Sequence, residues 1–119
     1  MISFEGVSKR YGALYAIHDI SFSIPKGQIL GLLGQNGAGK TTLMNILTGC
    51  LAPTSGTVSI GGHDLLLEPR EAKRLIGYLP ELTPVYDEMT VEAYLRFACA
   101  LKEVVPSAIN AHVAQICAK

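Results

Sequence analysis

The chain has 119 residues, of which 49% are hydrophobic and 17% are charged, and its ten basic and ten acidic side chains cancel. This balance excludes a disordered chain, which needs low hydrophobicity or high net charge, and a nucleic-acid binder built on a basic surface. The length suits one domain, although a chain with so many apolar and so few charged residues either has most of its surface covered or belongs to a larger protein. Cys50, Cys99 and Cys117 lack metal-ligand spacing and are interpreted as reduced thiols of a cytosolic protein. Because neither a signal peptide nor an uninterrupted apolar span is evident, we expect a soluble chain.

The first third of the sequence predicts antiparallel sheet. Apolar and polar residues alternate from Ile2 to Glu5 and again over Ile20–Ile24, which is typical of strands with one buried face. A Pro-Lys-Gly turn at 25–27 predicts that Ile20–Ile24 and Gln28–Leu33 form a hairpin. The second of these segments is apolar on both faces, as a buried parallel strand would be.

Helices dominate the expectation for the rest of the chain. An amphipathic helix with Leu43, Ile46, Leu47 and Cys50 on one stripe follows a glycine-rich loop. The next segments predict a one-sided strand at Thr57–Ile60, a charged helix at Glu68–Arg74 and an apolar strand at Leu75–Leu79, followed by a loop at Pro80–Glu88. Two further helices are predicted, one over 91–101 that is capped by Thr90 and one over 106–119 that begins at Pro106.

The motif that carries chemistry is Gly34-Gln35-Asn36-Gly37-Ala38-Gly39-Lys40-Thr41, a full match to G-x-x-x-x-G-K-[ST] between an apolar segment and an amphipathic helix. Its glycines let backbone N–H groups turn inward around a phosphate chain, and the following helix points its positive end at the same anion. Lys40 supplies a cation for the β- and γ-phosphates, the Thr41 hydroxyl can ligate Mg²⁺, and Thr42 offers a hydroxyl near the α-phosphate. The motif predicts a phosphate-binding loop rather than a glycine turn with an incidental lysine.

The sheet before this loop, together with five further segments, resembles the nucleotide-binding domain of ABC transporters. The likeness spans the whole chain and is carried by Ser8-Lys9-Arg10-Tyr11-Gly12, Asp19-Ile20-Ser21-Phe22, Pro53-Thr54-Ser55-Gly56, Ile76-Gly77-Tyr78-Leu79-Pro80 and Glu88-Met89-Thr90-Val91-Glu92. A GTPase would need an Asn-Lys-x-Asp motif, which the sequence lacks, and a small-molecule kinase usually has its P-loop near the N-terminus.

The resemblance implies an α/β fold: a P-loop NTPase core with an N-terminal antiparallel β-subdomain and the start of a helical subdomain, corresponding to the N-terminal half of the domain. It implies β-subdomain and core strands at 1–33 and 56–62, the P-loop and its helix at 34–50, a Q-loop region at 76–88 and the helical subdomain at 89–119. Tyr11 would stack on adenine. The intact domain would bind Mg²⁺ and ATP, pair head to tail with a second ATP-binding domain and drive a transmembrane permease from the inner face of the cell membrane.

Two departures from the family pattern bear on activity. Glu81 stands where the family's Q-loop usually has Gln, so a carboxylate would approach the metal. The signature Leu-Ser-Gly-Gly, the Walker B strand and the switch histidine are missing, and the Asp87-Glu88 pair lacks the apolar strand that Walker B needs.

Hydrolysis by this chain is therefore an open question. The leading interpretation is an ATP-binding fragment of an ABC transporter subunit, and the alternatives are a non-hydrolysing fragment or decayed gene product and, less well supported, an unrelated P-loop kinase. The resemblance implies that Ile29–Leu33 pairs with strands from the second half of the domain, so we expect the 119 residues alone to fold poorly. Without the Walker B aspartate and the catalytic carboxylate, we expect no release of phosphate from ATP.

Overall fold

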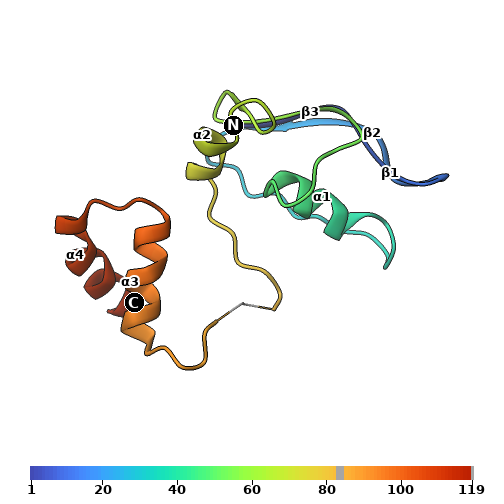
Figure 1. Ribbon diagram of the computed structural model, residues 1–119. Helices are drawn as coiled ribbons and strands as arrows, with labels where there is room; N and C mark the ends of the chain where they lie inside the picture. The colour runs from blue at the N-terminus through green and yellow to red at the C-terminus, as the bar shows by residue number, and fades with distance from the viewer. Residues whose placement is uncertain (83–84, 119) are drawn as a thin grey trace. The chain divides into compact units, whose positions relative to one another are not determined.

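The computed structural model describes residues 1–82 and 85–118 (Figure 1). The chain divides into two compact units, Met1–Tyr78 and a second unit that starts at Leu79. Parts of the predicted loop Pro80–Glu88 and the last residue of the predicted final helix lie outside the described residues.

The first unit is built on a four-stranded antiparallel sheet in the order β2-β1-β3-β4. Its strands are β1 (Ile2–Tyr11), β2 (Leu14–Ile24), β3 (Ser55–Ile60) and β4 (His63–Asp64). Ile2 pairs with Ile24 on one side and with Ile60 on the other, and Phe4 stacks on Phe22 with ring centroids 4.6 Å apart. These pairs confirm the antiparallel sheet that was predicted from alternation. The buried apolar residues of β1 contribute to one core, as expected for a sheet with one buried face.

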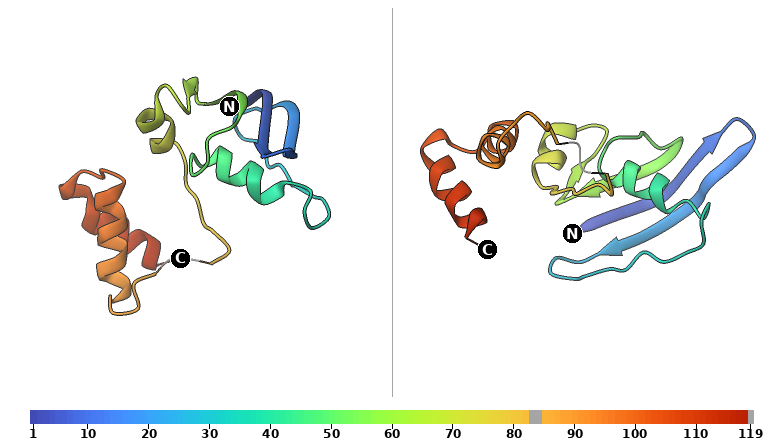
Figure 2. Two further views of the ribbon diagram at one scale, coloured as in Figure 1. Left: turned by 45° about the vertical axis from the view of Figure 1, so that its right-hand side comes forward. Right: turned by 90° about the horizontal axis from the view of Figure 1, so that it is seen from below.

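Two helices complete the first unit, α1 (Lys40–Leu47) and the short α2 (Pro69–Arg74). Figures 1 and 2 show α1 lying along one side of the strands. Its buried residues Leu43 and Ile46 join a single core with residues from the strands, from the turn after β4 and from α2, namely Phe4, Val7, Ile17, Val58, Ile60, Leu65 and Ala72. Cys50, predicted on the same stripe, lies beyond the last residue of α1 and is exposed.

Two predicted strands do not form. Gln28–Leu33 and Leu75–Leu79 have no strand structure, and Ile29 and Leu33 are almost fully exposed. The turn before the first segment does form, with the Gln28 N–H donating to the Pro25 carbonyl at 3.4 Å. A buried parallel strand needs neighbouring strands for its backbone and cover for its two faces. The described residues supply no neighbouring strand to these segments, although Ile76 packs partly against the core.

The second unit contains α3 (Val91–Leu101) and α4 (Pro106–Cys117). The predicted cap of α3 is confirmed, because the Thr90 Oγ1 accepts a hydrogen bond from the Ala93 N–H at 3.2 Å. Arg96 links the two helices by donating to the Asn110 side-chain oxygen at 2.7 Å. Among residues 1–82 and 85–118, no helix is long and apolar enough to cross a membrane.

Candidate phosphate-binding site

The loop 34–39 leads into α1, and its last residue, Gly39, lies close to the backbone of the sheet. Gly39 is the N-cap of α1 with a left-handed φ of 87°. A Cβ placed on Gly39 would lie 2.5 Å from the Ala16 carbonyl oxygen of β2, so both the conformation and the space demand glycine. This contact positions the start of α1 on the β1–β2 hairpin.

Ala16 lies at an irregularity of the sheet. It falls between the pairs Lys9–Ile17 and Arg10–Tyr15, where the register of β1 and β2 shifts by one residue. Such a bulge changes the local direction of the strand, and here it coincides with the close approach of Gly39 to the Ala16 carbonyl. The sequence gives no signal for Ala16, because the contact uses a backbone carbonyl and no side-chain motif marks it.

Lys40 folds back over the loop that precedes it. Its Nζ donates to the Gly34 carbonyl at 2.6 Å and to the Gln35 carbonyl at 2.8 Å. The Ala38 N–H donates to the same Gln35 carbonyl at 3.1 Å, which closes a turn inside the loop. An ammonium group carries three donors, so these two bonds orient the cation and still allow it to meet an anion in the loop.

The beginning of α1 suits a negative ligand. Gly39 makes no side-chain cap, and the first turn of the helix carries no acidic residue. The first backbone N–H groups of the helix therefore have no side-chain acceptor at the cap, and the positive end of the helix dipole points the same way. Thr41 is exposed and Thr42 is half-buried in this first turn, where hydroxyl groups can contact a phosphate or a metal.

Tyr11, the predicted adenine-stacking residue, lies at the end of β1 opposite Leu14. Its side chain is 53% exposed, and the Lys9 Nζ lies 5.4 Å from the centroid of its ring. Leu14 is two residues along β2 from Ala16, which is about 7 Å at the usual rise of a strand. The structure thus brings Tyr11 and the loop 34–39 to the same part of the first unit.

The acidic candidates lie in the second unit. Glu81 is exposed, and its approach to a metal at Thr41 stays a prediction. Asp87 and Glu88 are exposed in a turn rather than placed at the end of a strand.

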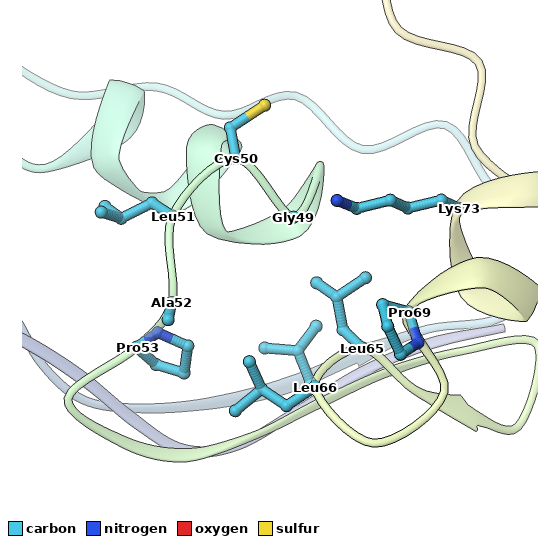
Figure 3. A pocket seen from close by; sticks show the side chains of 10 residues that line it. Gly49, Cys50, Leu51, Ala52, Pro53, Leu65, Leu66, Pro69 and Lys73 are labelled. Carbon is cyan, nitrogen blue, oxygen red and sulfur yellow. The ribbon is translucent and has the colours of Figure 1, made fainter. Parts of the chain in front are cut away.

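A separate pocket of about 200 Å³ lies between the loop that follows α1 and the segment that leads into α2 (Figure 3). The loop 49–53 forms one side, Leu65, Leu66 and Pro69 form the other, and the Lys73 side chain extends along the edge towards Gly49. All of its lining residues fall between Gly49 and Lys73, so it is distinct from the loop 34–39.

Comparison with known proteins identifies the family of this chain. A family model described as ABC transporter matches residues 17–119. The chain belongs to this ABC transporter family. The family recognised from the sequence motifs is therefore confirmed.

Similar ABC proteins come from bacteria and animals. This ABC chain is 42% identical over 98 residues to the uncharacterized ABC transporter ATP-binding protein YxlF of Bacillus subtilis, with 82% of this chain and 32% of that protein covered. It is 40% identical over 95 residues to ATP-binding cassette sub-family A member 2 of Homo sapiens, with 80% of this chain and 4% of that protein covered.

Solved structures confirm the fold class. An ATP-binding subunit of an ABC transporter superposes with a TM-score of 0.82 at 31% identity, with 90% of this chain and 45% of that chain covered. A dimeric ATP-binding cassette bound to ADP and Pi gives a TM-score of 0.81 at 20% identity over 97% of this chain and 55% of that chain, a likeness of fold. The ABC chain spans about half the length of these structures and corresponds to the N-terminal portion of an ABC ATPase domain.

Proposed function

We propose that this chain binds Mg²⁺ and ATP as the N-terminal part of the ATP-binding subunit of an ABC transporter. The observation that carries the proposal is the loop 34–39 with Lys40 bonded across it and an uncapped helix start beside it. A cation and a set of backbone N–H groups on one short loop form a site for a polyphosphate. Membership of the ABC transporter family makes ATP the nucleotide to test first.

Each residue of the site has a part in this proposal. Lys40 pairs with the β- and γ-phosphates, Thr42 contacts the α-phosphate and Tyr11 stacks on adenine. Thr41 would hold Mg²⁺ through its hydroxyl oxygen, and that ion would offset phosphate charge when bound. Glu81 stands at the family's Q-loop position, and its effect on the Mg²⁺ dependence of binding is to be tested. The phosphate chain is wrapped by the backbone of Gly34, Gln35, Asn36, Gly37, Ala38 and Gly39.

At the level of the whole protein, we propose that this domain pairs head to tail with a second ATP-binding domain and energises a transmembrane permease from the cytoplasmic face of the membrane. Two findings support this. The relatives are named as ABC transporter proteins, and one structural neighbour is a dimer with ADP and Pi.

The decisive experiment measures binding and turnover in the intact protein. Calorimetric titration with ATP, with and without Mg²⁺, tests binding, and Mg²⁺-dependent phosphate release tests hydrolysis. Binding that weakens in EDTA supports the proposal, whereas equal affinity for ATP and for a neutral nucleoside contradicts it because the phosphates would then contribute nothing.

The second candidate is a nucleotide-binding chain without turnover. Among the described residues, Asp87 and Glu88 lie exposed in a turn and therefore do not supply the catalytic carboxylate that a P-loop ATPase uses. ATP binding without phosphate release would support this candidate over the first.

A further inference from the structure

Lys9 makes two contacts that join the candidate nucleotide-stacking residue to a distant part of the chain. Its Nζ donates to the Ala52 carbonyl at 2.8 Å, and the same atom lies over the Tyr11 ring, 5.4 Å from the centroid. Lys9 and Tyr11 are two residues apart on β1, so their side chains leave the strand on the same side. One ammonium group thus connects the Tyr11 ring to the loop that follows α1.

That loop is firmly attached to β1. The Thr54 N–H donates to the Ser8 carbonyl at 2.8 Å, and the Arg10 N–H donates to the Thr54 Oγ1 at 3.0 Å. The Ala52 carbonyl therefore belongs to a segment whose position relative to β1 is set by hydrogen bonds on both sides of Lys9. Figure 3 shows Ala52 between Leu51 and Pro53 in this loop.

We propose that Lys9 is a positioning residue for nucleotide binding, which holds the Tyr11 ring from one face so that the other face meets the base. The inference rests on the proposed function and adds a residue to it. Tyr11 is 53% exposed, which leaves room on its ring for a stacked base. A ring that is already oriented loses less rotamer freedom when the base binds, so removal of the cation lowers affinity for nucleotides specifically.

The neighbouring Arg10 provides a matched control. Its Cζ lies 5.9 Å from the centroid of a different ring, that of Tyr15, and Tyr15 packs edge-on against His18. Arg10 of β1 is thus also a cation over a tyrosine, but that tyrosine, Tyr15 of β2, has no proposed role in base binding. Replacing Arg10 changes the local charge as much as replacing Lys9 does.

The experiment compares Lys9→Met, Lys9→Arg and Arg10→Met in the intact protein, by calorimetric titration with Mg²⁺-ATP and with inorganic tripolyphosphate. We expect Lys9→Met to weaken ATP binding about two- to fivefold, the usual size of an exposed cation–π contact, with unchanged affinity for tripolyphosphate. Lys9→Arg and Arg10→Met should keep both affinities. In a Tyr11→Ala background, Lys9→Met should cause no further loss of ATP affinity.

Several results would overturn the inference. An equal loss for ATP and tripolyphosphate would make Lys9 a phosphate contact or a support of the fold, and an equal loss in Arg10→Met would make the effect one of general charge. If Lys9→Met lowers ATP affinity even in the Tyr11→Ala background, or does not lower it at all, Lys9 does not act on the base through Tyr11. If the parent binds ATP through Lys40 and Lys9→Met is neutral, the inference alone fails, whereas a parent that binds neither ligand contradicts the proposed function as well.

Discussion

Two adjacent segments of the first unit, 28–33 and 34–40, fold in opposite ways. The first is the most apolar run before α1, and yet it forms no strand and exposes Ile29 and Leu33. The second is rich in glycine and polar groups, and yet it has a defined loop closed by Lys40. The difference shows that the loop 34–40 forms hydrogen bonds within its own segment, whereas a buried strand needs hydrogen-bond partners from other strands of the sheet.

The largest effect should come from the cation that closes the loop. Lys40→Ala removes charge-assisted hydrogen bonds to the β- and γ-phosphates, so we expect ATP affinity to fall roughly 10- to 100-fold. Titration with a fluorescent ATP analogue measures it, and Lys26→Ala, a lysine in the exposed turn before residues 28–33, is the control. Equal affinity in Lys40→Ala and parent would refute the role of Lys40.

A pair of glycine variants contrasts the two segments directly. Gly39→Ala forces a left-handed residue to carry a Cβ that would meet the Ala16 carbonyl, whereas a Cβ at Gly31 would meet nothing within 4 Å. We expect Gly39→Ala to cost about 1–3 kcal/mol and to weaken ATP binding about tenfold, and Gly31→Ala to change ATP affinity little. Thermal unfolding and ATP titration measure both effects. Comparable losses in the two variants would show that the loop is no more constrained than the segment before it.

Tyr11→Ala tests whether the hairpin end takes part in the same site. Only ATP has a ring to stack, so its affinity should fall about fivefold to tenfold while the affinity for inorganic triphosphate stays unchanged. Parallel titrations with the two ligands measure the difference. If both ligands lose the same affinity, Tyr11 does not touch the base.

The smallest expected effect concerns the second unit. If Glu81 approaches the metal, its carboxylate repels the triphosphate until Mg²⁺ lies between them, so Glu81→Gln should lower the dependence of ATP binding on Mg²⁺ a few-fold. Comparing ATP affinity in Mg²⁺ and in EDTA for both proteins measures it, with Glu88→Gln as the control. An unchanged Mg²⁺ dependence would place Glu81 away from the metal.

Local signals in the sequence determined much of this protein. The P-loop motif predicted the loop and α1, alternation predicted the sheet of β1, β2 and β3, and Thr90 predicted the start of α3. The motifs also identified the family, which the family model confirms over residues 17–119. These features were accessible because each depends on residues that are close together in the chain.

The tertiary structure alone decided how those pieces meet. The contact of Gly39 with Ala16 and the bond of Lys9 to Ala52 join residues that are far apart in sequence, and both end on backbone carbonyls. Segments 28–33 and 75–79 have the composition of strands but form none. The physical reason is common to all of them: a backbone group or an apolar face is satisfied only by the neighbour that the fold brings to it, and local composition does not specify that neighbour.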